Sequence, residues 1–214
     1  MKDILSEIVL NKKVEVARKK ELLPLHELEK QLLQRKDAIK FRSLKEALLN
    51  SKTGIIAEFK RRSPSKGWLH EHANVNEVTK AYENAGASAL SVLTDQNYFG
   101  GTQADLNNAV QNVQIPVMRK EFIVDEYQIF EAKLMGASAI LLIAAAITQE
   151  ESKRFTKLAN ELQLDVLLEL HDESETDYIT TLNSLVGINN RNLGTFVTDL
   201  QKSFRRSEEH TSEL

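Results

Sequence analysis

The sequence contains no cysteine. This absence excludes a disulfide framework, a thiolate zinc site and a cysteine nucleophile. No apolar run approaches the roughly 20 residues that span a bilayer, and the first residues lack the apolar segment of a signal peptide. We therefore expect a cytoplasmic protein with no membrane segment.

An excess of charge of one sign is also lacking. The 28 basic and 31 acidic residues give a formal net charge of −3. Such a balance offers no broad positive field for holding nucleic acid, whereas a local site for a small anion stays open. We expect a small-molecule substrate and no nucleic-acid partner.

The 214 residues suit one globular domain, since 42% of them are hydrophobic and can form a substantial core. Residues 1–53 have helical spacing, with Ile4, Ile8 and Val9 on one face and leucines continuing the pattern among charged residues. We expect this segment to form a helical extension ahead of the main domain, which spans residues 54–205.

Beyond residue 53, short apolar runs alternate with amphipathic stretches, as in consecutive βα units around a parallel sheet. The sequence Gly-Ala-Ser-Ala occurs at 86–89 and again at 136–139, each time where a predicted helix ends and a strand begins. Strict alternation fits either an open doubly wound sheet or a closed barrel. The expected strands are 55–59, 89–93, 117–120, 139–143, 166–170 and 186–190. The expected helices are 75–85, 104–113, 126–135, 149–162 and 173–183.

Charged and amide side chains stand at the ends of four predicted strands, and they include Glu58, Lys60, Lys120, Glu169 and Asn189. Side chains alternate along a strand, so Glu58 and Lys60 share one face. In a barrel, such groups meet at the carboxyl-terminal mouth, where barrel enzymes keep their catalytic residues. The alternative is that each charge is only the solvated end of its strand. Two lysines and two glutamates in one cleft would shift one another's pKa values, as general acid–base catalysis requires.

Two other patterns have less support. Residues 60–62 and Lys66 could form a basic nucleic-acid patch, but four basic residues in one short loop are commonly solvated. Residues 171–173 (HDE) suggest metal ligands, yet consecutive strand residues point in alternate directions and rarely share one ion. We therefore expect no metal site. The single tryptophan, Trp68, either closes over a substrate or packs on the rim of the fold.

The strand-end segments, taken together, resemble the indole-3-glycerol phosphate synthase family. Their order and spacing match the family from about residue 4 to about residue 204, although an aspartate often stands at the position of Glu121 in the family. The matching segments are 58–65 (EFKRRSPS), 92–95 (VLTD), 98–101 (YFGG), 119–123 (RKEFI), 168–172 (LELHD) and 187–193 (GINNRNL). The resemblance implies a TIM (β/α)8-type barrel, of which this chain would hold about six of the eight βα units.

The resemblance also implies an activity and a role for each strand-end group. The activity is the closure and decarboxylation of 1-(2-carboxyphenylamino)-1-deoxyribulose 5-phosphate, with no metal or organic cofactor. Lys120 would be the general acid, Lys60 would pair with the substrate carboxylate, and Glu169 would be the general base of the dehydration. Glu58 would hold the lysines, and Asn189 would orient the substrate hydroxyls.

Further residues would line the substrate pocket: Ser63, Phe99, Phe122 and Arg191, of which the two phenylalanines suit a planar anthranilate ring. Another phosphate-binding barrel, such as phosphoribosylanthranilate isomerase or the tryptophan synthase α subunit, is the alternative enzyme. The lysines on the first and third strands disfavour both. A non-catalytic fragment is the alternative outside enzymes.

The end of the sequence carries a separate expectation. Residues 206–214 (RSEEHTSEL) have no apolar face at either period, and we interpret them as a non-native tail. Members of the resembling family continue through two more βα units, whose loops and helix N-terminus hold the substrate phosphate. The expectation is therefore that the chain as given does not catalyse the reaction, and that the complete enzyme is a monomer.

Overall fold

The computed structural model describes residues 4–35 and 40–190, and three of its helices precede the first strand. They are α1 (Ile4–Leu22), α2 (Leu25–Arg35) and α3 (Leu44–Leu49). Pro24 separates α1 from α2, since proline has no backbone N–H to continue a helix. The predicted helical character of the amino-terminal segment is confirmed, whereas the boundary at residue 53 stays a prediction. Arg191 and the interpreted tail at 206–214 lie outside the described residues.

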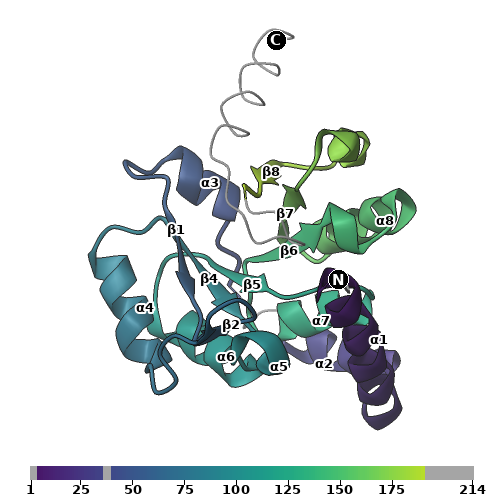
Figure 1. Cartoon of the computed structure of the whole chain (residues 1–214), viewed down its shortest axis with the longest axis horizontal. Helices are drawn as coiled ribbons and strands as arrows, with labels where there is room; N and C mark the ends of the chain where they lie inside the picture. Colours follow the sequence, from purple (N-terminus) through teal and green to yellow (C-terminus); the bar gives the residue numbers. More distant parts are fainter. Residues whose placement is uncertain (1–3, 36–39, 191–214) are drawn as a thin grey trace, which may run out of the picture.

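A curved parallel sheet forms the centre of the molecule (Figure 1). Its neighbouring strands follow one another along the chain, as in a (β/α) barrel, whereas a doubly wound sheet reverses its order at a switch point. The predicted α/β barrel class, with six βα strands present, is confirmed. The strands are β1 (Ile56–Phe59), β4 (Ala89–Leu93), β5 (Val117–Lys120), β6 (Ala139–Ile143), β7 (Asp165–Leu170) and β8 (Leu185–Ile188).

Helices lie along the outer side of the sheet (Figure 1). Thr102 and Thr148 begin two of them with capping boxes, in which a threonine and an acidic residue three positions later satisfy each other's backbone N–H groups. The helices are α4 (Val75–Asn84), α5 (Gln96–Phe99), α6 (Gln103–Asn112), α7 (Tyr127–Leu134) and α8 (Gln149–Glu161), with short 3-10 helices η2 (Ala144–Ala146) and η3 (Glu173–Tyr178). A small hairpin of β2 (Arg62–Ser63) and β3 (Gly67–Trp68) follows β1.

The predicted helix at 173–183 is wrong in its second half, because η3 ends at Tyr178. Just beyond that point the Asn183 side chain accepts hydrogen bonds from the backbone N–H and the hydroxyl of Thr180, at 2.8 and 3.0 Å. Short polar side chains that bond the local backbone favour a turn over a helix. The next strand, β8, then begins at Leu185.

The two faces of the sheet have separate apolar cores, because side chains alternate along each strand. On the outer face, Leu90 and Ile140 pack under the helices and are fully buried. On the inner face, Met118 and Leu141 pack against Leu44 of α3, which closes the amino-terminal end of the sheet interior. The charged groups of the cavity lie at the opposite, carboxyl-terminal end of the interior.

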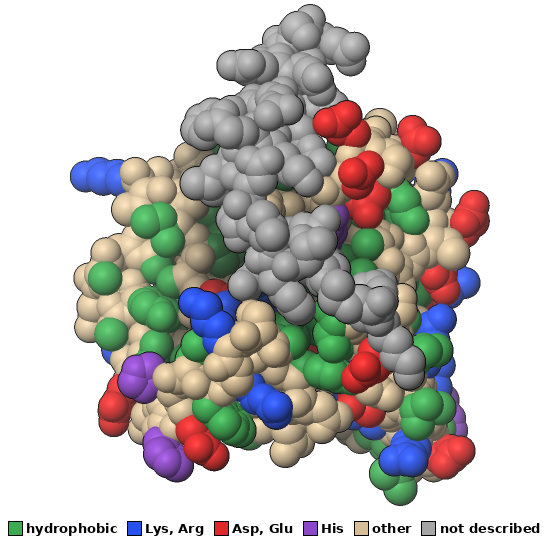
Figure 2. Space-filling view, viewed as in Figure 1, with side chains coloured by type: hydrophobic (Ala, Val, Ile, Leu, Met, Phe, Trp, Pro, Cys, Tyr) green, Lys and Arg blue, Asp and Glu red, His purple; other side chains and the backbone are tan. Residues whose placement is uncertain are grey.

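The surface has no field of one sign on the side seen in Figure 2, where basic and acidic side chains are scattered over the part that is not grey. In the described ranges, 4–35 and 40–190, no helix is both long and apolar enough to cross a membrane.

Candidate active site

Three of the predicted catalytic residues form one hydrogen-bonded group at the carboxyl-terminal end of the sheet interior. Lys120 Nζ donates to Glu58 Oε2 at 2.7 Å, and Lys60 Nζ donates to the other oxygen, Glu58 Oε1. One carboxylate is thus shared by two lysines from different segments. The strand period brings them together, since Ile56 and Met118, two residues before Glu58 and Lys120, lie in the inner core.

Glu169 and Asn189 complete the group from the neighbouring strands. Asn189 Nδ2 donates to Glu169 Oε1 at 3.0 Å, and His171 Nε2 lies 3.1 Å from the same oxygen. The backbone N–H of Asn189 bonds Leu170 O at 2.8 Å, which holds the residue beside β7 just past the end of β8. We call Glu58, Lys60, Lys120 and Glu169 the pocket cluster.

Glu58, Glu169 and Lys120 of the pocket cluster stay charged. Burial works against the charge of Glu58, but Lys120 and Lys60 together hold the pKa of this carboxyl below its usual range. Burial likewise opposes the charge of Glu169, whose pKa is nevertheless lowered by His171, Lys120 and Asn189. For Lys120, burial alone would lower the pKa, but Glu58 and Glu169 raise it. An ammonium that can donate a proton therefore lies beside a carboxylate that can accept one.

A cavity of about 250 Å³ lies over this cluster. Phe99 and Phe122, which we call the aromatic pair, both line it and contact each other, with ring centroids 5.9 Å apart and ring planes tilted by 36°. Among the described residues, the lining is Ile4, Leu5, Ile8, Glu58, Lys60, Ser63, Pro64, Ser65, Leu93, Phe99, Lys120, Phe122, Ile143, Glu169 and Asn189. Every predicted site residue that the structure describes is in this lining, and Arg191 is not among the described residues.

The apolar wall contributed by α1 was not predicted from the sequence. Leu5 and Ile8 are 6% and 3% exposed, and they line the cavity opposite the strand ends. From the sequence alone, this helix is expected only as an extension ahead of the barrel. The signal was the shared face of Ile4 and Ile8, which shows that the helix covers something but not what it covers.

The basic residues after β1 have partners in the fold. Arg61 makes a bidentate pair with Asp105, at 2.7 and 2.8 Å, and donates to Gly100 O at 3.2 Å. Arg62 donates to Asn97 O at 3.0 Å and lies over the ring of Trp68. Trp68 therefore packs on the rim, and it is half exposed. Within residues 4–35 and 40–190, no three histidine or acidic side chains are grouped so that they could hold a metal ion.

Comparison with known proteins identifies the family. The family model for indole-3-glycerol phosphate synthase matches residues 5–213. The chain belongs to this family. Its members are carboxy-lyases of tryptophan biosynthesis with a TIM-barrel fold and a phosphorylated small-molecule substrate, and the resemblance noted from the strand-end segments is confirmed.

Three curated relatives, all named indole-3-glycerol phosphate synthase, show how much of the family the chain spans. The relative from Bacteroides thetaiotaomicron is 50% identical over 205 residues, which cover 96% of this chain and 78% of that protein. The relative from Clostridium kluyveri is 42% identical over 201 residues, or 94% of this chain and 76% of that protein. The relative from Neisseria meningitidis serogroup B is 51% identical over 150 residues, or 70% of this chain and 58% of that protein.

Proposed function

We propose that this protein converts 1-(2-carboxyphenylamino)-1-deoxyribulose 5-phosphate to indole-3-glycerol phosphate, carbon dioxide and water. The observation that carries the proposal is the meeting of Lys120 and Glu169 in one cavity with the aromatic pair. A proton donor, a proton acceptor and two apolar ring faces are what the closure of an aromatic ring onto a ketone requires.

The first step forms the new carbon–carbon bond. The ring carbon that bears the carboxylate attacks the ketone carbon, and the ketone oxygen takes a proton from Lys120. The raised pKa of Lys120 keeps this group protonated until the oxygen becomes basic. Glu58, 2.7 Å away, holds the ammonium in place and offsets its charge.

The second step expels carbon dioxide. The bond from the ring to the carboxylate breaks, and its electron pair restores the aromatic ring. Until then, the carboxylate needs a cation, and we assign Lys60 to this task because its ammonium lies at the same cavity on the other oxygen of Glu58.

The third step is a dehydration. The new hydroxyl takes a proton from Lys60 and leaves as water, while Glu169 removes a proton from the neighbouring ring carbon, which forms the last double bond. The lowered pKa of Glu169 keeps it ionised and able to accept this proton. Asn189 bonds Glu169 at 3.0 Å and would orient the substrate hydroxyls.

Other residues of the proposal bind rather than react. Ser63 is 6% exposed at the cavity wall, where its hydroxyl accepts a hydrogen bond from the backbone N–H of Lys66. We assign Ser63, the aromatic pair and Arg191 to substrate binding. The proposal also includes a monomeric enzyme of the cytoplasm with no nucleic-acid partner and no metal or organic cofactor. The balanced net charge of −3 supports the absence of a nucleic-acid partner.

The test is an assay that follows indole absorbance and carbon dioxide together. It uses the chain and a chimera in which the Bacteroides relative supplies the part of its own length that the match leaves uncovered. We expect the chimera to form equal amounts of indole product and carbon dioxide, unchanged after treatment with EDTA. Isomerised substrate without carbon dioxide release would instead support an isomerase such as phosphoribosylanthranilate isomerase.

A further inference from the structure

A lysine lies in the middle of the buried face of α1. Leu5, Ile8, Lys12 and Val16 follow one another at helical spacing, and all four are buried. Lys12 is 5% exposed. A buried ammonium is costly unless it is paired and hydrogen-bonded, so its partners show what the helix is held against.

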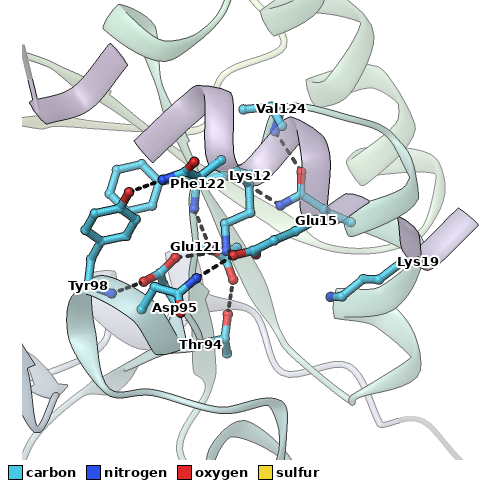
Figure 3. A network of polar contacts seen from close by, with 12 residues as sticks. Lys12, Glu15, Lys19, Thr94, Asp95, Tyr98, Glu121, Phe122 and Val124 are labelled. Carbon is cyan, nitrogen blue, oxygen red and sulfur yellow. Dashed lines mark hydrogen bonds and ion pairs between the residues drawn. The ribbon is translucent and has the colours of Figure 1, made fainter. Parts of the chain in front are cut away.

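The partners of Lys12 come from two other segments of the barrel as well as from α1 (Figure 3). Its Nζ lies 2.9 Å from Asp95 Oδ2, just after β4, and 3.2 Å from Glu121 Oε1, just after β5. Glu15, one turn along α1, lies 2.7 Å away. Burial alone would lower the pKa of Lys12, but these carboxylates raise it, so the residue is a permanent cation at neutral pH.

The same two carboxylates fix the backbone that carries the aromatic pair. Glu121 Oε1 accepts a hydrogen bond from the backbone N–H of Phe122 at 2.9 Å. Asp95 caps the short helix α5, with its Oδ1 accepting from the backbone N–H of Tyr98 at 2.7 Å, and α5 ends at Phe99. Lys12 therefore pairs with both of the carboxylates that bond this backbone, at Phe122 and at Tyr98 (Figure 3).

Removal of this cation has a definite structural consequence. The side chains of Asp95 and Glu121 are 0% and 3% exposed, so without Lys12 they would be like charges held close together away from water, and Arg119 would compensate Glu121 from 3.7 Å. They would move apart or admit solvent, and the N–H groups of Phe122 and Tyr98 would move with them. The apolar wall of α1 would also lose its ionic tether to the barrel.

We propose that Lys12 is a positioning residue, which sets the spacing between the α1 wall and the aromatic pair and so shapes the site for the anthranilate ring of the substrate. The inference rests on the proposed function for the identity of the ring. It adds to that function a residue that touches neither the substrate nor the pocket cluster.

The variant for the test is Lys12→Met, which keeps the length of the side chain and removes its charge. Lys20→Met is the matched control, because Lys20 also lies on α1 and also pairs with a barrel carboxylate, Asp125, at 2.6 Å. The Lys20 side chain is 40% exposed, and its pair does not involve the backbone of the aromatic pair. If Lys12→Met does not fold, the double variant Lys12→Met/Glu121→Gln replaces it. This variant removes one of the uncompensated charges and leaves a side-chain oxygen that accepts the hydrogen bond from the backbone N–H of Phe122.

Binding is measured with reduced substrate, in which an alcohol replaces the ketone so that no ring can form, on both the chain and the chimera. The fluorescence of its anthranilate group reports the Kd. The emission of Trp68 without ligand reports the position of α5, since the indole lies against the helix cap at Gly100. We expect Lys12→Met to weaken binding at least about tenfold and to shift the Trp68 emission, and Lys20→Met to stay within about twofold of the wild type.

A purely structural role would lower the melting temperature of Lys12→Met and leave the Kd of the folded protein unchanged. That result would overturn the proposal, and so would failure of both Lys12 variants to fold while Lys20→Met folds. If wild-type protein does not bind reduced substrate, the proposed function fails and the positioning role fails with it. If it binds normally and Lys12→Met has no effect, only the positioning role fails.

Discussion

Two clusters of charged side chains in the described residues have opposite arrangements of charge. In the pocket cluster one carboxylate, Glu58, is shared by two lysines whose side chains are 31% and 34% exposed. In the second cluster one lysine, Lys12, is shared by Asp95 and Glu121, which are almost sealed from water, and by Glu15, which is 34% exposed. Arg119 lies 3.7 Å from Glu121 and 3.2 Å from Glu131, and we call Lys12, Asp95, Glu121, Arg119 and Glu131 the buried cluster.

The comparison shows that solvent access, and not charge alone, separates a site that can react with a substrate from one that can only hold the structure together. A group in the pocket cluster can meet a substrate and exchange protons with it. A group in the buried cluster can do neither, and breaking its pairs leaves an uncompensated charge inside the protein. Substitutions in the pocket should therefore change turnover, whereas substitutions in the buried cluster should change stability and shape.

The largest expected effect is on stability and comes from Arg119→Met. Arg119 is 1% exposed, lies 3.2 Å from Glu131 and donates to Gln128 O at 2.8 Å. Removing one member of a buried pair costs about 3 to 5 kcal/mol of unfolding free energy. Urea unfolding measures this loss of unfolding free energy. Lys80→Met is the control, since the surface pair of Lys80 with Glu83 should contribute no more than about 1 kcal/mol. Equal losses in the two variants would remove the distinction between buried and exposed pairs.

The next effect is on turnover, which is measured in the chimera for this variant and the following ones, and it comes from Lys120→Ala. Loss of the general acid should lower kcat at least about 100-fold, which corresponds to about 2.7 kcal/mol. The melting temperature should change little, because the side chain is 31% exposed. Lys80→Ala is the control. A variant that turns over normally would exclude Lys120 as the acid and leave Lys60 as the candidate.

Glu169→Gln should have a smaller effect, confined to the chemical step. Glutamine keeps the shape and the hydrogen-bonding reach of the side chain but cannot take a proton, so kcat should fall at least about tenfold while KM changes little. Ser63→Ala should show the opposite emphasis, with a raised KM and nearly normal kcat. A change in KM alone for Glu169→Gln would contradict the role of base.

The smallest expected effect is a pH-dependent difference in stability between the wild type and Glu58→Gln. The folded-state pKa of Glu58 is lowered, so its contribution to stability is present above the unfolded value of about 4.3 and is lost as the pH falls through the folded value. The wild type should exceed Glu58→Gln by about 1 kcal/mol above pH 5, and the difference should shrink towards pH 3. Urea unfolding at several pH values measures it. A difference independent of pH would mean that Glu58 is not held as an anion by the lysines.

Much of the pocket could be predicted from the sequence because one short-range rule generates it. The alternation of side chains along a strand places Glu58 and Lys120 on the inner face, and parallel strands bring their carboxyl ends to one edge. Each of the six strands was predicted to within two residues for the same reason. The helix at 173–183 failed because side-chain bonds at Asn183 compete with helix propagation.

Lys12 and the α1 wall could not be predicted in the same way. A lysine on a helix is normally a solvated residue, and its partners Asp95 and Glu121 are distant in the sequence. The available signal was the spacing of four that places Lys12 between Ile8 and Val16 on the buried face. A cation in the middle of an apolar stripe implies a buried anion, but the sequence does not say where that anion lies.

The central claim is that the ammonium group of Lys120 is the acid that closes the ring, and the absence of cysteine makes it directly testable. In Lys120→Cys of the chimera, with any cysteine of the added segment replaced by serine, the new thiol is the only one in the protein, so 2-bromoethylamine converts it to a thioether that ends in an ammonium at nearly the lysine position. We predict that Lys120→Cys loses at least about 99% of indole formation, that 2-bromoethylamine restores a large part of it, and that iodoacetamide, which adds a neutral amide, restores none. Full activity in unmodified Lys120→Cys, or equal rescue by both reagents, would contradict the account.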